Sequence, residues 1–195
     1  MCCSIPAPIG SCAASYVEEH ARSSGLSRFG VLVVGGKLHS GRQAGFARRL
    51  ESRFKDAELV VDDTGEYSRA HAHEIVWRNI QGQPEGKPCL RYIFCTNDEM
   101  ALGAVDALRT AGAGNDDSVV VVGVDGTPEA RALIESQTTP LRATVVQDSC
   151  SIAETTVDML VRMTCGDTVK TCTYLEPGIY KASAKRWQAG PIPRG

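Results

Sequence analysis

Three polar residues have the chemistry to bind a ligand rich in hydroxyl groups: Arg42, Asn97 and Asp125. A carboxamide both donates and accepts hydrogen bonds, a carboxylate accepts them, and a guanidinium donates them as a planar fork. Each residue also has an ordinary structural use. Asn97 and Asp125 could cap helices, and Arg42 could be a solvated surface arginine, so the local sequence leaves both interpretations open.

The elements that would position these side chains alternate between strands and helices. The apolar run 92–95 has the length and residue types of a buried strand, and helix-capping types follow it at 96–98. Apolar residues then recur at helical spacing from Met100 to Leu108. Asn97 therefore follows the carboxyl end of a predicted strand, which is the end where open parallel α/β sheets bind ligands.

The same alternation extends along the chain and predicts a three-layer, doubly wound α/β fold with a parallel sheet. The uninterrupted apolar segment 119–124 is typical of a parallel strand covered on both faces, and Asp125 follows it at once. The other predicted strands are 29–34, 57–61, 143–146 and 171–175, and the other predicted helices are 12–23, 42–54, 68–80, 129–136 and 152–161. Residues 1–11 are expected to be an irregular lead-in, and the chain from Pro177 onward a tail.

Composition and charge argue against several classes of function. The net charge of -2 and the pI near 6.1 supply no basic patch, so we expect no direct contact with nucleic acid. No apolar stretch approaches the roughly 20 residues that span a bilayer. The N-terminus lacks the charged and apolar regions of a signal peptide.

No metal or cofactor is expected either. The eight cysteines show no metal-ligand spacing, and reduced thiols are favoured, which indicates a cytosolic setting. His71 and His73 would point in different directions on a helix, and the acidic loop 62–66 lacks the spacing of an EF-hand. The glycine-rich loop 35–41 lacks the first glycine and the Ser or Thr of a phosphate-binding P-loop.

Gln147 follows a further predicted strand and completes a set of four motifs. They are Ser-Gly-Arg-Gln-Ala-Gly-Phe around Arg42, Thr-Asn-Asp-Glu-Met-Ala-Leu-Gly around Asn97, Val-Val-Gly-Val-Asp-Gly-Thr-Pro-Glu-Ala around Asp125 and Ala-Thr-Val-Val-Gln-Asp around Gln147. In wording and order they resemble the type I periplasmic sugar-binding proteins, and the ligand-sensing domains of LacI-type transcription regulators share this pattern. The likeness runs from about residue 13 to about residue 182.

The resemblance implies a non-catalytic clamp that holds a monosaccharide between two Rossmann-like lobes. It implies that Arg42, Asn97 and Asp125 hydrogen-bond sugar hydroxyls from the second lobe, and that Gln147 does so from a strand near the hinge. Tyr67 lies where an aromatic ring often packs on the sugar in these proteins. Residues 12–183 would then form the second lobe and the C-terminal segment, and residues 184–195 a tail.

A complete member of the resembled family has a first lobe of on the order of 100 residues ahead of this likeness. Without that lobe, the apolar face of the helix at 152–161 lacks its partner. We therefore expect a fragment of a longer protein, a homodimer, or a rearrangement that covers this face.

Three functions compete at this point. The first is carbohydrate binding, as the periplasmic receptor of an ABC-type sugar transporter with its permease, or as a sugar sensor joined to a signalling domain. The segment Gly-Val-Asp-Gly-Thr-Pro-Glu-Ala resembles the transport receptors more than the LacI-type regulators. The second is the effector domain of a cytoplasmic LacI-type regulator with a DNA-binding domain on a longer chain, which the cysteines and the absent signal peptide favour. The third is an enzyme on the same sheet, which is not expected because no nucleophile and base pair stands at a strand end.

Overall fold

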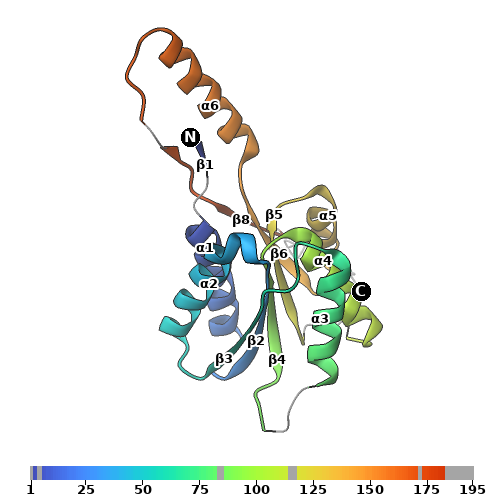
Figure 1. The fold of residues 1–195 in the computed structure, drawn as a ribbon. Helices are drawn as coiled ribbons and strands as arrows, with labels where there is room; N and C mark the ends of the chain where they lie inside the picture. Colours follow the sequence, from blue (N-terminus) through green and yellow to red (C-terminus); the bar gives the residue numbers. More distant parts are fainter. Residues whose placement is uncertain (1, 4–5, 83–85, 114–117, 171–172, 183–195) are drawn as a thin grey trace, which may run out of the picture.

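The computed structural model describes residues 2–3, 6–82, 86–113, 118–170 and 173–182, and it shows a three-layer α/β fold (Figure 1). The middle layer is a six-stranded sheet with the order β3-β2-β4-β5-β6-β8. All neighbouring strands are parallel except β8, which runs antiparallel to β6. The strands are β2 (Phe29–Val34), β3 (Ala57–Asp62), β4 (Leu90–Cys95), β5 (Val120–Asp125), β6 (Leu141–Val146) and β8 (Gly178–Lys181). The predicted doubly wound α/β class is confirmed.

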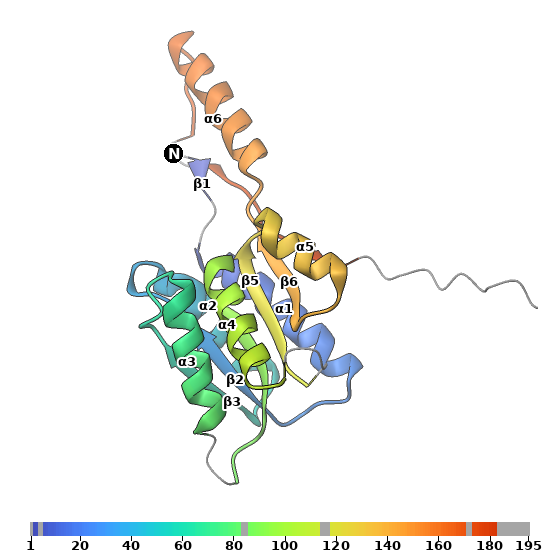
Figure 2. The ribbon, with the colours of Figure 1, turned by 90° about the vertical axis from the view of Figure 1, so that its right-hand side faces the viewer.

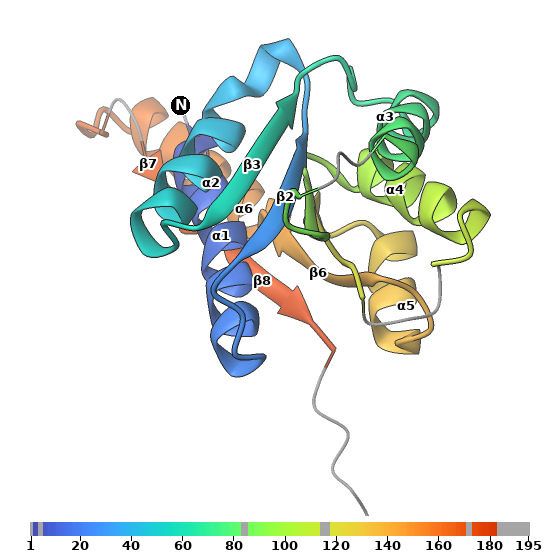
Figure 3. The same ribbon diagram turned by 90° about the horizontal axis from the view of Figure 1, so that it is seen from below.

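Helices cover both faces of this sheet, as the view from below shows (Figure 3). On one face lie α1 (Pro6–Ser23) and α2 (Ser40–Arg53), and on the other lie α3 (Arg69–Gln81), α4 (Asp98–Thr110) and α5 (Pro128–Ser136). A short 3-10 turn, Lys37–His39, precedes α2. Because the sheet is covered on both faces, its central strands can be apolar throughout, as β5 is up to Val124.

The core consists of two apolar clusters, one on each side of the sheet. On the α1 and α2 side, the rings of Phe46 and Phe94 stack with their centroids 4.4 Å apart. On the other side, Met100 and Leu102 from α4 are fully buried against the strands. The strand β4 thus contributes buried apolar side chains to both clusters, and their burial holds β4 in place. Asn97 follows the carboxyl end of this strand.

Two glycine contacts hold α1 against α2. A Cβ atom at Gly10 would lie 1.8 Å from the carbonyl oxygen of Arg42, and one at Gly45 would lie 2.1 Å from that of Ala7. Only glycine permits backbones to approach so closely. The close approach fixes the first turn of α2, which carries Arg42.

Two sequence predictions at the ends of the chain are wrong. The expected lead-in at 1–11 is helical from Pro6 onward, because proline is compatible with the first helical turn and because Ile9 is buried against the core. The expected tail contains β8, which pairs with β6 because Ile179 and Tyr180 pack against the two clusters. Residues 184–195 lie outside the described residues.

A second group of elements stands apart from the sheet (Figures 1 and 2). It consists of α6 (Ser149–Thr164) and the parallel pair β1 (Cys2–Cys3) and β7 (Thr173–Tyr174). The predicted last strand at 171–175 is reduced to β7, and residues 171–172 are not described.

Within the described residues, the apolar face of α6 is uncovered, in line with the expectation that it lacks its partner. No residue of α6 is buried. The exposed fraction is 59% for Val157, 57% for Leu160, 55% for Val161 and 57% for Met163. In the part of the chain that the structure describes, no helix is long and apolar enough to cross a membrane.

Candidate functional site

The carboxyl ends of the strands bring three of the five predicted site residues together. Asp125 ends β5, Gln147 directly follows the neighbouring β6, and Arg42 lies in the first turn of α2. Gln147 Nε2 donates a hydrogen bond of 3.2 Å to Asp125 Oδ1, and Arg42 Nη1 lies 3.7 Å from the same oxygen. One carboxylate oxygen therefore links side chains from three elements.

Arg42 is not a solvated surface arginine, because only 11% of its side chain is exposed. Its Nη1 atom donates to the backbone carbonyl of Thr96, just beyond β4. Its Nε atom is buried and has no hydrogen-bond partner among the described residues. A cation in the first turn opposes the helix dipole, so these acceptors at the strand ends account for its placement.

Asp125 does not cap the following helix, because Thr127 occupies the N-cap position of α5. The φ angle of Asp125 is 114°, which is a strained value for a residue with a side chain. Its side chain remains 39% exposed at the end of the sheet. The strained backbone thus holds a carboxylate where a ligand can reach it.

A buried carboxylate, Asp98, supports the loop that carries Asp125. Asp98 is fully buried, and its two oxygens accept hydrogen bonds of 2.7 Å from the Thr144 hydroxyl and 2.7 Å from the Thr127 backbone N–H. The Thr144 hydroxyl also accepts a bond of 3.2 Å from the Gly126 N–H. Burial raises the pKa of Asp98, and the hydrogen bonds from Thr144 and Thr127 partly offset that rise.

The hydrogen-bond network of Asp98 is closely packed against Gly123. A Cβ atom at Gly123 would lie 2.3 Å from Asp98 Oδ1. Real side chains do not approach so closely, so a larger residue at 123 would displace the carboxylate. The network joins β5, β6 and α4 beneath the Asp125 carboxylate.

Asn97 has the capping role that the sequence left open. Its Oδ1 atom accepts a hydrogen bond of 2.9 Å from the Met100 backbone N–H at the start of α4. This bond involves only the side-chain oxygen of Asn97. The amide nitrogen has no hydrogen-bond partner among the residues that the structure describes, so it can donate to a ligand. The cap fixes the carboxamide plane at the end of β4, so capping and ligand binding are compatible in this residue.

Tyr67 follows β3 on the same end of the sheet. Its hydroxyl donates a hydrogen bond of 3.4 Å to the carbonyl of Gly36, in the turn after β2. A Cβ atom at Gly36 would lie 2.8 Å from the Tyr67 ring, and the ring also packs against the core cluster of α3 and α4. The structure therefore holds the Tyr67 side chain between the turn after β2 and this core cluster.

Sequence reasoning missed two polar residues at this end of the sheet. It treated Asp98 only as a helix-capping type, although the residue is fully buried, and it did not consider Gln43. Gln43 is 7% exposed and its Nε2 atom is buried without a partner among the described residues. A Cβ atom at Gly35 would lie 1.8 Å from that nitrogen. The available signal for Gln43 was its position beside Arg42 in the same motif.

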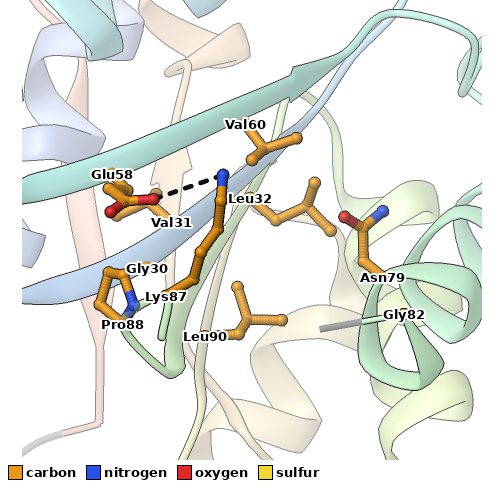
Figure 4. Close-up of a pocket in the computed structure, with 10 residues that line it drawn as sticks. All are labelled: Gly30, Val31, Leu32, Glu58, Val60, Asn79, Gly82, Lys87, Pro88 and Leu90. Carbon is orange, nitrogen blue, oxygen red and sulfur yellow. Dashed lines mark ion pairs between the residues drawn. The ribbon is translucent and has the colours of Figure 1, made fainter. Parts of the chain in front are cut away.

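A separate cavity of about 240 Å³ lies at the opposite, amino ends of β2, β3 and β4 (Figure 4). Leu32, Val60 and Leu90 form apolar walls, and Glu58 and Lys87 form an ion pair of 3.5 Å beside them. None of the five predicted site residues lines this cavity. No group of three or more His, Cys, Asp or Glu residues that could hold a metal occurs within the described ranges.

Comparison with known proteins identifies a family. Residues 8–168 match the family described as "Periplasmic binding protein domain". The D-allose-binding periplasmic protein of Escherichia coli (strain K12) is 32% identical over 158 residues, which cover 78% of this chain and 47% of that protein. A ribose import binding protein of Bacillus subtilis (strain 168) is 29% identical over 115 residues, covering 59% of this chain and 33% of that protein.

Solved structures share the fold. A periplasmic solute-binding protein of an ABC transporter from Actinobacillus succinogenes 130z, with bound D-allose, superposes with a TM-score of 0.78 at 19% identity. The match covers 91% of this chain and 59% of that chain. The present chain thus spans about half the length of the two allose-binding proteins and a third of the ribose-binding protein.

Proposed function

Because the chain belongs to the Periplasmic binding protein domain family, we propose that its strand-end site binds a monosaccharide without catalysing a reaction. The observation that carries this proposal is the meeting of Arg42, Asp125 and Gln147 at one carboxylate oxygen. The relatives named above are binding proteins rather than enzymes, and the sugars in their names are D-allose and ribose.

The distances suit an inserted hydroxyl group. Arg42 Nη1 and Asp125 Oδ1 are 3.7 Å apart, which is beyond hydrogen-bond length. A sugar hydroxyl near both groups would accept a bond from the guanidinium and donate one to the carboxylate. Gln147 and the amide nitrogen of Asn97 would then meet neighbouring hydroxyls with further donors. In this arrangement the Tyr67 ring supplies an apolar wall for the sugar ring.

The uncovered face of α6 is a candidate surface for packing against a first lobe. The chain spans 47% of the length of its allose-binding relative, and α6 exposes Val157, Leu160, Val161 and Met163. A first lobe that covered these side chains would remove a contiguous apolar surface from water. It would also enclose the sugar from the second side, which supplies much of the buried contact in such sites.

We extend the proposal to export and transport. The relatives named above include periplasmic and import-binding proteins, which favours a periplasmic receptor that delivers its sugar to an ABC permease. They favour this role over the effector domain of a LacI-type regulator. The periplasmic location applies to the protein when it is exported.

The proposal is tested by titrating the chain with D-allose and D-ribose and following backbone amide shifts by NMR. Asp125→Asn removes one acceptor and should weaken binding roughly tenfold, equivalent to about 1.4 kcal/mol. Asp63→Asn is the matched control, because Asp63 is an exposed aspartate near the same end of the sheet. Unchanged affinity in Asp125→Asn, or an equal loss in Asp63→Asn, would show that the site is assigned wrongly.

A further inference from the structure

The cavity of about 240 Å³ at the amino ends of β2, β3 and β4 lies where one face of the edge strand β3 is left open. Side chains alternate along a strand, and Ala57 and Leu59 pack into the cluster on the α1 and α2 side. Val60 therefore points to the other side of the sheet, where none of the described β3 residues belongs to the cluster of α3 and α4. The exposed fraction of Val60 is 47%, so this part of the sheet presents an apolar side chain to a ligand.

The walls of this cavity are mainly apolar. Leu32 and Val60 come from the neighbouring strands β2 and β3, and Leu90 begins β4. An apolar cavity of about 150 Å³ can hold a benzene molecule. The present volume of about 240 Å³ therefore accommodates one aromatic ring together with a substituent or a second fused ring.

An unused acceptor faces this apolar space. In Figure 4 the carboxamide of Asn79 and the side chain of Lys87 flank the apolar walls from opposite sides. Asn79 Nδ2 donates a hydrogen bond of 2.9 Å to the backbone carbonyl of Ile75 within α3. The Asn79 Oδ1 atom has no hydrogen-bond partner among the described residues, so it can accept a bond from a ligand.

The charged pair beside the cavity favours an uncharged aromatic ligand. Lys87 Nζ lies 3.5 Å from Glu58 Oε2, and the two formal charges cancel. Because this distance is longer than an ordinary hydrogen bond, the ammonium group is still able to approach another partner. A ring in the cavity would present its electron-rich face to this cation, which is a favourable contact.

We propose that this cavity binds a small, uncharged aromatic compound that carries a single O–H or N–H group. The ring occupies the space between Leu32, Val60 and Leu90, and the O–H or N–H group donates to Asn79 Oδ1. A sugar does not suit this site, because several of its hydroxyl groups would be buried against apolar walls without partners. The inference does not depend on the proposed sugar site, which lies at the opposite ends of the strands.

The experiment uses the full chain, labelled with ¹⁵N, and phenol and indole as probes. We expect saturable shifts of the backbone amides of Val31, Gly82 and Leu90, which line the cavity. Asn79→Ala removes the acceptor and should weaken phenol binding roughly fivefold. The affinity for toluene, which has no group to donate, should not change in the same variant.

A matched pair of substitutions tests the position of the ring. Val60→Phe places a ring of the protein itself in the cavity and should abolish the binding of phenol and indole. Val61→Phe is the control, because Val61 is 52% exposed on the same strand but points to the other side of the sheet. Lys87→Met keeps the apolar stem without the charge, so it should weaken phenol binding roughly two- to fivefold and leave cyclohexanol binding unchanged.

Several results would overturn the proposal. One is the absence of saturable shifts at the cavity amides with phenol and indole up to about 10 mM, because binding would then be weaker than a specific site of this kind provides. Equal losses in Val60→Phe and Val61→Phe would place the ligand elsewhere. Equal losses for phenol and toluene in Asn79→Ala would refute the hydrogen bond to Oδ1. A far-ultraviolet circular dichroism spectrum identifies any variant that fails to fold, and Val60→Met, a smaller change that also fills the cavity, then replaces Val60→Phe.

Discussion

Replacing Thr144 with valine tests the buried network beneath the proposed sugar site. The two side chains have nearly the same shape, so Thr144→Val removes the hydroxyl without opening a cavity. The hydroxyl donates a 2.7 Å bond to the Asp98 carboxylate and accepts a 3.2 Å bond from the Gly126 N–H. A hydrogen bond to a charged group contributes about 1.5–3 kcal/mol, and the second lost bond about 0.5–1.5 kcal/mol, so the free energy of unfolding should fall by roughly 2–4.5 kcal/mol.

The matched control is the same substitution at Thr96, which directly follows β4. Thr96 is 1% exposed, but its hydroxyl has no hydrogen-bond partner among the described residues. Thr96→Val should therefore leave the free energy of unfolding unchanged or raise it slightly. Urea denaturation of both variants, with the slope of the transition compared to the parent, measures the difference. The reasoning is refuted if Thr144→Val stays within about 0.5 kcal/mol of the parent, a change typical of surface sites.

Three further predictions concern the same scaffold. Gly123→Ala should lower the free energy of unfolding by about 1–3 kcal/mol in urea denaturation, because its Cβ would lie 2.3 Å from Asp98 Oδ1. The control Gly178→Ala meets no atom within 4 Å and should not destabilise the protein, so equal effects of the two substitutions would contradict the prediction. Leu160→Lys should reduce self-association in analytical ultracentrifugation, because it places a charge on the exposed apolar face of α6. The midpoint of unfolding should not change, because α6 buries no side chain, and a lowered midpoint would contradict the prediction. Burial raises the pKa of Asp98, so the contribution of this group to the free energy of unfolding is complete below its ordinary pKa of 3.8 and is lost as the pH rises through the raised pKa. Asp98→Asn should lack this part of the pH dependence of stability. A variant that retains it would contradict the prediction.

The central part of the fold follows from local sequence patterns. The strand at Phe29–Val34 has the bounds that the sequence predicts, and β5 is shifted by only one residue because Asp125 extends it. Apart from Asp125 these strands are apolar, and such uninterrupted apolar segments are typical of strands that are buried on both faces. The capping types predicted at 96–98 include Asn97, which is the N-cap residue of α4 in the structure.

The ends of the chain depend on tertiary contacts that no local pattern records. The helix that begins at Pro6 is stabilised by the close approach of Gly10 to the Arg42 backbone, and that approach is a property of the packed pair of helices. The strand β8 forms because β6 offers an open edge and two core clusters accept Ile179 and Tyr180. Proline and glycine in these segments favour irregular structure when each is considered alone.

The proposed site was only partly predictable for a related reason. The sequence motifs indicated three polar residues of the site: Arg42, Asp125 and Gln147. The order of the strands in the sheet brings the other two side chains close to Asp125 Oδ1. The role of Asp98 was not evident, because an aspartate after a strand ordinarily caps a helix in solvent. Its burial results from the positions of Gly123 and Thr144 on the two adjacent strands, which are far from it in the sequence.

The most direct test of the sugar-binding account is to map where a sugar contacts the protein. D-allose should shift the side-chain amide resonances of Gln147 and Asn97 and the backbone amide of Asp125 in a saturable manner. The backbone amide of Leu90, at the opposite end of the sheet, should not move. Shifts confined to the Leu90 end, or no saturable shift with D-allose or D-ribose at any of these groups, would contradict the proposed function.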